Sequence, residues 1–329
     1  MEVDLLRLGE RLAPVPVEDI RPLGGGASSL TYEGTIAGDG ARRVVVKVAP
    51  AGLPPVRNRD VLRHARVLRA LRPTAVPVPD VLWDDPGDPP DVPPLFVMSF
   101  VDGTSLEPLF DLDGDEEAAV VGERLRNAAR TMAALHELDT VALGLGGEPL
   151  VGLDDEIERW CRLLGTVDPA LVPGWERAAA ALRTRQPAAL PGAVVHGDFR
   201  LGNVLAVGSR IEAVVDWEIW SVGDPRVDVG WFLVNADPAT YGRATRYAES
   251  LPVPAELAAS YRAAIERDVP ELEWFQALAC FKSAATWSLI VKHNRRRAEP
   301  APATEQIAPV LPHLLERTHE LLHETTEEV

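Results

Sequence analysis

Hydrophobic side chains in the first hundred residues recur mostly with the spacing of β-strands. Residues 18–49 have this pattern, and Val44 to Val48 is a β-branched run, Val-Val-Val-Lys-Val, with one charge inside it. Residues 57–72 instead place apolar side chains three and four apart, which predicts a helix. Short strands are expected at 80–83 and 95–100, and a Pro- and Asp-rich stretch surrounds the first of them.

Beyond residue 100 the spacing becomes helical. A short β section at 193–217 interrupts a series of predicted helices, at 115–138, 155–165, 174–186, 225–235, 254–268, 271–294 and 304–325. Strands that come first and helices that come later indicate an α+β architecture. We therefore expect a small β-rich N-lobe at 1–100 and a larger, mainly helical C-lobe at 101–329.

Composition limits the classes of function. The 329 residues suggest two domains or one domain with two lobes, at about 100–200 residues per domain. The net charge of −17 disfavours nucleic acid as a partner. Met1 to Ala13 has no continuous apolar signal core, and no run is long enough to span a bilayer, so a cytoplasmic protein without a membrane partner is expected. Cys161 and Cys280 lie in apolar, helix-like contexts that favour buried free thiols.

The most informative segment runs from Val194 to Leu233. Two short apolar runs, Val204 to Val207 and Ile211 to Val215, flank a Gly-Ser-Arg turn and predict a β-hairpin. If the turn centres near Ser209, Asn203 pairs opposite Val215, and Asp216 follows at the same open end. Asp198 lies on the loop just before the hairpin.

Two carboxylates and one amide oxygen therefore converge in a small region. Such oxygen ligands suit Mg²⁺, which binds one or two carboxylates together with substrate phosphates. Protein kinases use a related layout, in which one Asp accepts a hydroxyl proton while an Asn and a second Asp hold the metal. The spacing His-x-Asp-x₄-Asn, then a hairpin and Asp, matches that layout at His196, Asp198, Asn203 and Asp216. The alternative is an ordinary polar hairpin with capping residues.

The amino-acid sequence of this segment resembles that of a known family. His-Gly-Asp-Phe-Arg-Leu-Gly-Asn-Val-Leu, then Val-Val-Asp-Trp-Glu, then Gly-Asp-Pro-Arg-Val-Asp-Val is similar to the aminoglycoside phosphotransferase superfamily, which has the protein-kinase-like bilobal fold. It looks most like the branch that also occurs fused to acyl-CoA dehydrogenases. The resemblance covers roughly residues 18–300 and is most specific at 194–233.

The resemblance implies a role for each motif residue. Asp198 would be the catalytic base, or would orient the acceptor hydroxyl. Asn203 and Asp216 would be the magnesium ligands. His196 would brace the catalytic loop rather than react, and Asp228 would tie that loop to the following helix.

The strand Val44 to Val48 also fits this template. Lys47 would contact the α- and β-phosphates of the nucleotide, although a lysine in an edge strand can also be a solubilising charge. The stretch before it would be the phosphate-covering loop, through Gly24, Gly25, Gly26, Ser28 and Ser29. It is not a Walker A loop, because no Gly-Lys-Ser/Thr follows.

One position departs from the family pattern. A helix glutamate usually pairs with the strand lysine, but His64 stands at the matching place. Asp60, four residues earlier on the same predicted face, could substitute as the partner of Lys47. Backbone groups at the lobe connection, at Met98, Ser99 and Val101, would hold the nucleotide base. ATP is the default donor and GTP is the alternative.

The acceptor site should lie in the helical lobe. Its candidate residues are mostly aromatic and comprise Glu218, Trp220, Trp274 and Trp287, with Trp217, Trp231, Asp237 and Phe281 as further possibilities. Any single tryptophan is more often a core residue than a binding wall.

The sequence thus predicts a Mg²⁺-dependent small-molecule kinase. It would move the γ-phosphoryl group of ATP to a hydroxyl of an unknown metabolite or of an aminoglycoside- or macrolide-type antibiotic. The alternative is a catalytically impaired, kinase-like nucleotide-binding or regulatory protein, which the His64 departure supports. The intact set Asp198, Asn203 and Asp216 argues against that alternative.

Overall fold

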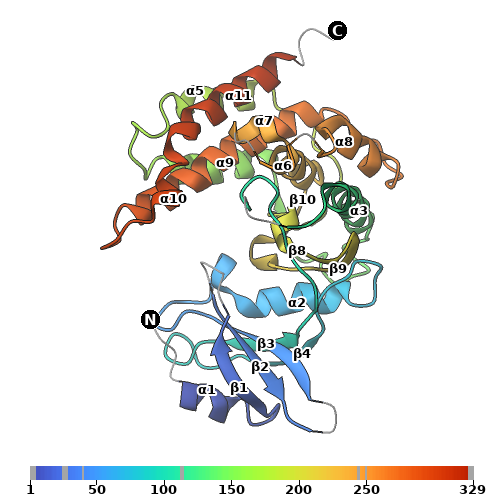
Figure 1. Cartoon of the computed structure of the whole chain (residues 1–329), viewed down its shortest axis with the longest axis vertical. Coiled ribbons are helices and arrows are strands. Elements are labelled where there is room, and N and C mark those ends of the chain that lie inside the picture. The colour runs from blue at the N-terminus through green and yellow to red at the C-terminus, as the bar shows by residue number, and fades with distance from the viewer. Residues whose placement is uncertain are drawn as a thin grey trace. The chain divides into compact units, whose positions relative to one another are not determined.

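The chain divides into two compact units (Figure 1). A computed structural model describes residues 5–23, 29–38, 41–111, 115–242, 245–248 and 250–324. The first unit comprises Met1–Ser105, Val141–Gly146 and Asn203–Trp220. The second unit comprises Leu106–Thr140, Gly147–Gly202 and Ser221–Val329. The first unit thus includes the predicted hairpin, which lies a hundred residues after the rest of that unit in the sequence.

An antiparallel five-stranded sheet forms the body of the first unit. Its strand order is β1-β2-β3-β5-β4. The strands are β1 (Val17–Pro22), β2 (Leu30–Ile36), β3 (Arg42–Val48), β4 (Val81–Asp85) and β5 (Leu95–Ser99). The β-branched run places β3 at the centre of the sheet, between β2 and β5, where both of its edges are hydrogen-bonded.

The alternation along β3 separates two faces. Val44, Val46 and Val48 are buried in one apolar cluster with Leu8 and Leu12, from or just after α1 (Leu5–Arg11). Lys47 lies on the other face, on the side of α2 (Val61–Leu71), which packs on β4 and β5. Because β3 is an internal strand, Lys47 is not a solubilising charge on an edge strand.

The predicted hairpin is present as β8 (Val204–Val207) and β9 (Arg210–Val214). Its turn passes through Gly208, whose φ of 58° is left-handed and suits a residue without a Cβ. An isolated bridge between Thr104 and Ala206 and a hydrogen bond from Val214 N to Pro77 O join the hairpin to the rest of the first unit. These contacts explain why a segment so late in the sequence belongs to this unit.

The second unit is mainly helical. Its longest helix is α9 (Leu272–Asn294), which packs against α6 (Arg226–Ala236), α4 (Leu153–Leu164), α5 (Trp175–Thr184) and α11 (Leu311–Glu324). The remaining helices are α3 (Ala118–His136), α7 (Pro238–Tyr241), α8 (Pro254–Arg262) and α10 (Pro302–Glu305). A small sheet, ordered β6-β10-β7, carries β6 (Leu150–Val151), β10 (Ser221–Gly223) and β7 (Ala193–Val195).

Two helix predictions need correction. The helix expected at 304–325 is broken: α10 ends at Glu305, a 3₁₀ turn covers Ala308–Val310, and α11 begins at Leu311. Pro309 and Pro312 account for the break, because proline cannot donate the backbone hydrogen bond of a helix interior. The helix expected at 254–268 ends already at Arg262.

The other predicted helices, and the strands predicted at 80–83 and 95–100, lie within a few residues of their predicted bounds, and the α+β expectation is confirmed. The short elements α1, α7 and β6 were not predicted. Cys161 and Cys280 are buried and free, as expected. Across the described ranges, we find no helix with the length and apolarity that a membrane crossing requires.

Candidate active site

The loop after β7 is held by a buried carboxylate in the second unit. Asp228 Oδ2 accepts a hydrogen bond from His196 N at 2.6 Å, and Oδ1 accepts one from Gly197 N at 2.8 Å. Asp228 is 0% exposed. Burial alone would raise the pKa of Asp228, but hydrogen bonds from His136 and from the loop lower it below its ordinary value. A charged Asp228 therefore fixes the backbone immediately before Asp198.

His196 contributes to the same loop through its ring. The imidazole is buried, and its Nδ1 accepts a hydrogen bond from Asp198 N at 3.1 Å. The ring also meets Phe199 edge-on, with centroids 5.8 Å apart. Gly197, which lies between His196 and Asp198, has a φ of 84°, a left-handed conformation that strains any residue with a Cβ. His196 thus contacts the Asp198 backbone, which fits a bracing role.

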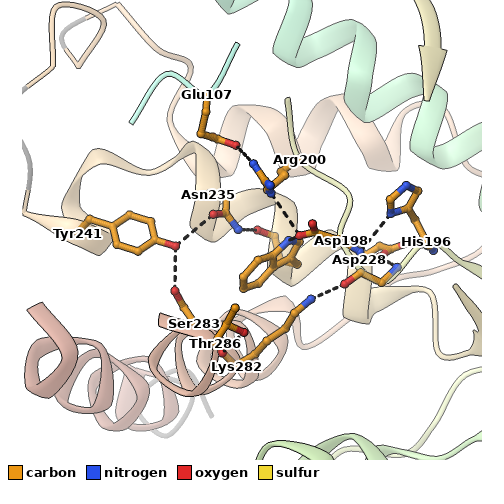
Figure 2. A network of polar contacts seen from close by, with 12 residues as sticks. Glu107, His196, Asp198, Arg200, Asp228, Asn235, Tyr241, Lys282, Ser283 and Thr286 are labelled. Carbon is orange, nitrogen blue, oxygen red and sulfur yellow. Dashed lines mark hydrogen bonds and ion pairs between the residues drawn. The ribbon is translucent and has the colours of Figure 1, made fainter. Parts of the chain in front are cut away.

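The Asp198 carboxylate is held from two sides (Figure 2). Its Oδ1 accepts a hydrogen bond from Trp231 Nε1 on α6 at 2.7 Å, and a second from Arg200 Nε at 3.3 Å. The side chain is 24% exposed. The carboxylate is therefore fixed in direction while part of it still faces solvent, as a group that meets a substrate must be.

Arg200 is shared between two carboxylates. Its Nη1 donates to Glu107 Oε2 at 2.6 Å, while its Nε serves Asp198. Burial raises the pKa of Glu107 to about 7, even though Arg200 attracts the charged form. A Cβ at Gly202 would lie 2.2 Å from Arg200 Nη1 and 2.9 Å from Glu107 Oε2, so the ends of these two side chains would have to shift. The second glycine of the motif therefore leaves room for this ion pair.

A lysine from the interior of α9 completes the surroundings of the loop. Lys282 donates to the carbonyl oxygen of Gly197, and its Nζ lies 3.7 Å from the centroid of the Trp231 ring. The residue is 5% exposed. Burial lowers the pKa of Lys282 to about 8, although Asp198 nearby favours the charged form.

The first unit holds the other expected groups. Lys47 Nζ lies 3.1 Å from Asp216 Oδ1, and Lys47 is 7% exposed. Val215 N donates to Asn203 O at 2.9 Å, which confirms the pairing expected from the hairpin pattern. Asp216 has a left-handed backbone, with φ 64° and ψ 53°, uncommon for a residue with a side chain. Such strain is often kept at functional positions.

The residues considered as partners of Lys47 have different surroundings. Asp60 is the N-cap of α2, and its carboxylate accepts a hydrogen bond from Arg63 N at 3.0 Å. The expected pairing of Asp60 with Lys47 is therefore replaced by a capping bond, and Lys47 is paired with Asp216 instead. His64 is 4% exposed and meets Phe96 edge-on, with centroids 5.8 Å apart.

A small hollow, with a cavity volume of about 10 Å³, lies beside the Lys47–Asp216 pair. His64, Phe96 and Met98 contribute to its wall, together with both members of the pair. The helical spacing therefore predicted the direction of His64 correctly: it faces the same hollow as Lys47.

The nucleotide loop and the lobe connection are described only in part. Gly24, Gly25, Gly26 and Ser28 lie outside the described residues. Ser29 is buried, and its Oγ has no hydrogen-bond partner within the described part of the chain. Ser99 N donates to Asp80 O at 2.8 Å, so this N–H, one of the groups expected at the base, is already engaged within the sheet. Val101 follows β5 in irregular backbone.

Two of the acceptor candidates are core residues and need correction. Trp274 is 2% exposed and donates from Nε1 to Leu182 O at 3.1 Å. Trp220 is 2% exposed, in the first unit, with the Arg63 guanidinium 4.0 Å from its ring centroid. Because both indoles are buried in packing contacts, neither offers an open wall.

The other acceptor candidates differ from these two. Trp287 is half-buried beside Phe110, with ring centroids 5.1 Å apart, and Glu218 is half-buried. Trp217 and Phe281 are fully buried, and Asp237 caps α7 by accepting from Ala239 N at 2.9 Å. Trp231, named only as a binding wall, instead contacts Asp198 directly.

Three further residues near Asp198 were not predicted from the sequence: Glu107, Arg200 and Lys282. Arg200 stands two residues after Asp198 in the motif, and this proximity was an available signal. Lys282 is a lone charge in an apolar helical run, Leu-Ala-Cys-Phe-Lys-Ser-Ala-Ala, which was a second signal. Glu107 gave no signal, because its partner is 93 positions away.

Comparison with known proteins identifies the family. The model of the phosphotransferase enzyme family matches residues 19–275. The chain belongs to this family. The match spans both units and includes the loop around Asp198, and the resemblance noted in the sequence is confirmed.

Individual relatives agree with this assignment. Acyl-CoA dehydrogenase family member 10 of Mus musculus is 27% identical over 211 residues, covering 63% of this chain but only 19% of the relative's length. A structure of a putative aminoglycoside phosphotransferase from Ralstonia eutropha JMP134 is 21% identical, covers 98% of this chain and 99% of that chain, and has a TM-score of 0.76.

A second solved structure is that of a thermostable mutant of aminoglycoside phosphotransferase APH(4)-Ia, in ternary complex with AMP-PNP and hygromycin B. It is 16% identical, with a TM-score of 0.61, and the match covers 94% of this chain and 98% of that chain. At these identities the solved structures establish the phosphotransferase fold, with its antiparallel sheet and helices.

Proposed function

We propose that this protein transfers the γ-phosphoryl group of ATP to a hydroxyl group of a small molecule. The observation that carries the proposal is the Asp198 carboxylate, which Trp231 and Arg200 fix in direction and which remains partly exposed. A carboxylate so held can orient an acceptor hydroxyl and accept its proton as the oxygen–phosphorus bond forms. Family membership supports the reaction class.

The donor nucleotide would be held by groups of the first unit. Lys47 would contact its α- and β-phosphates, since the ammonium already pairs with a carboxylate at the edge of the hollow. The AMP-PNP in the APH(4)-Ia complex favours an adenine nucleotide here, while GTP remains the alternative donor. The Ser29 hydroxyl, buried and unpartnered among the described residues, suits a contact with a phosphate oxygen.

Asn203 and Asp216 would hold Mg²⁺. The donor set fits this ion, because an amide oxygen and a carboxylate are hard ligands and Mg²⁺ completes its shell with phosphates and water. Within the described ranges, no group of three or more His, Cys, Asp or Glu side chains forms a cage for a metal. When bound, the ion would neutralise charge on the transferred phosphoryl group.

The acceptor class is a small hydroxyl compound, either a metabolite or an antibiotic. APH(4)-Ia was crystallised with hygromycin B, so an aminoglycoside is one candidate. The half-buried Phe110–Trp287 pair, whose rings are tilted by 30° to each other, offers an aromatic surface in the second unit, the unit that also contains Asp198. An acceptor with an apolar face as well as a hydroxyl would use this surface.

Consumption of Mg²⁺-ATP across a panel of hydroxyl compounds tests the proposal. The panel should hold sugars, amino alcohols, hydroxy acids, aminoglycosides and macrolides. We expect acceptor-dependent turnover that is lost with EDTA and in Asp198→Ala, but kept in Asp139→Ala, an exposed aspartate of the same unit. Turnover that survives in Asp198→Ala would remove Asp198 from the reaction.

The second candidate is a nucleotide-binding protein without phosphotransfer. The buried His64 favours it, because this side chain faces the hollow where the family pattern has an acid that pairs with the lysine. A thermal-shift measurement with Mg²⁺-ATP distinguishes both candidates from a protein that binds no nucleotide, because only a nucleotide-binding protein gains in melting temperature. Stabilisation by ATP without turnover on any acceptor would favour the binding protein.

A further inference from the structure

Lys282 is a buried cation in a helix whose residues are mostly buried. It lies in the middle of α9, between Phe281 and Ser283, which are both 0% exposed. Burying an ammonium costs free energy unless contacts compensate it, so lysine is seldom buried without a reason. Among the described residues, no carboxylate oxygen forms an ion pair with the Lys282 ammonium at an N···O distance of 4 Å or less.

The two nearest contacts of the Lys282 ammonium lead to the loop of Asp198, whereas the centroid of the Trp160 ring lies further away, at 5.5 Å. Its ammonium donates to Gly197 O, the carbonyl immediately before Asp198, and lies 3.7 Å from the centroid of the Trp231 ring. Trp231 in turn donates to Asp198 Oδ1 at 2.7 Å. One ammonium thus contacts both the backbone and the indole that fix the carboxylate. Figure 2 shows Lys282 and Asp198 in the same network of polar contacts.

We infer that Lys282 is a positioning residue for Asp198, acting through the Gly197 carbonyl and the Trp231 ring. This inference rests on the proposed phosphotransfer. The ammonium anchors the peptide before Asp198 and, by a cation–π contact, sets the plane of the indole that holds the carboxylate. Because one ammonium holds both the Gly197 carbonyl and the Trp231 ring, the Asp198 carboxylate is kept in a single orientation.

A purely structural role explains the residue less well. Methionine has a similar length and fills apolar gaps without desolvating a charge, so it would serve packing alone better than lysine. The other charged groups that face Lys282 are Glu156 and Arg159 of α4 and Asp228 of α6. They differ in sign, and Glu156 already accepts from Trp160 Nε1 at 3.3 Å. The geometry at Gly197 and Trp231 is therefore the distinctive feature.

Steady-state kinetics of three full-length variants tests the inference. Lys282→Met should lower kcat by up to about 100-fold, the size expected for a misplaced catalytic group. Its KM for ATP should stay near the wild-type value, since a change in direction at Asp198 affects the chemical step. Lys282→Arg keeps a charge and donors and should recover much of kcat. Lys292→Met, the same change on the same helix at a lysine that donates to Thr166 O, should behave as wild type.

A double-mutant cycle with Trp231→Phe measures the coupling. Phenylalanine keeps an aromatic face for the ammonium but loses the N–H that holds Asp198. If Lys282 acts through Trp231, the loss of kcat in the double variant is smaller than the product of the two single losses. Fully multiplicative losses, or a wild-type kcat in Lys282→Met, would overturn the inference.

A readout that needs no turnover separates this inference from the proposed function. In protein labelled with 5-fluorotryptophan, Trp231→Phe identifies the ¹⁹F resonance of Trp231. Lys282→Met should shift or split that resonance and leave the others nearly unchanged. An unmoved resonance would overturn the inference. A shifted resonance in a protein that phosphorylates no acceptor would instead count against the proposed function alone.

Discussion

At the scale of single residues, one guanidinium serves two carboxylates. Arg200 contacts both Glu107 and Asp198, and burial raises the pKa of Glu107 to about 7. An acid whose pKa is raised on folding binds its proton more tightly in the folded state than in the unfolded state. The free energy of unfolding contributed by Glu107 is therefore fully present below its unfolded pKa of about 4.5. It is lost as the pH rises towards about 7.

This sign gives a direct prediction for Glu107→Gln. Glutamine cannot titrate, so the fall in the free energy of unfolding between pH 4.5 and 7.5 should be smaller in the variant than in wild type. The difference should reach up to about 3 kcal/mol, at 1.36 kcal/mol for each unit of pKa shift. Urea unfolding at several pH values measures it. Parallel pH profiles for the two proteins would show that Glu107 keeps an ordinary pKa when folded.

The residues of the candidate site were predictable to different degrees. The spacing of His196, Asp198, Asn203 and Asp216 lies in one short segment, and so a pattern could identify it. The groups around Asp198 come from elsewhere: Glu107 is 93 positions from Arg200, and Lys282 is 85 positions from Gly197. Sequence spacing carries no information on such contacts, because packing of the helices determines them.

At the scale of elements, the N-terminus of α2 depends on Asp60. Its carboxylate caps the helix by accepting from Arg63 N. Asp60→Ala should lower the free energy of unfolding by about 1 kcal/mol, the usual loss for an N-cap, and leave the affinity for ATP unchanged. Asp60→Asn keeps a capping oxygen and should cost less. Denaturant unfolding with an ATP titration measures both effects. A strong loss of ATP affinity in an otherwise stable Asp60→Ala would restore Asp60 as the partner of Lys47.

The packing of α6 on α9 depends on a glycine. A Cβ at Gly230 would lie 2.3 Å from Phe275 O and 2.4 Å from Phe275 C, which are backbone atoms of the facing helix. Gly230→Ala should therefore cost about 1–3 kcal/mol, although alanine is the better helix former. Gly147→Ala is the matched control, since a Cβ there meets nothing within 4 Å. Equal stability of the two variants would contradict the close helix contact.

Element types followed from local pattern, whereas some boundaries did not. The β-branched run of β3 and the helical spacing of α2 identified both elements. The pattern at 304–325 was apolar at helical spacing, and it predicted one helix because Pro309 and Pro312 were given too little weight. A proline removes one backbone donor, and this local loss outweighs a favourable pattern around it.

At the scale of the whole molecule, the chain passes between its two units more than once. One passage falls between Gly202 and Asn203, inside the motif, so that Asp198 belongs to the second unit and Asn203 to the first. A single domain boundary near residue 100 could not predict that the hairpin belongs to the first unit, because contacts with Thr104 and Pro77 attach it there. The groups proposed for the nucleotide and those proposed for the acceptor are accordingly contributed by different units.

Asp198 is proposed to serve phosphoryl transfer to a small-molecule hydroxyl. Mass spectrometry of acceptors incubated with the full chain and Mg²⁺-ATP tests it most directly. We predict that at least one hydroxyl compound gains the mass of one phosphoryl group. Asp198→Asn, which keeps an oxygen for Trp231 but cannot accept the proton, should lower the rate by about 10²- to 10⁴-fold. Product formed equally fast by wild type and Asp198→Asn, or by neither on any acceptor, would contradict the account.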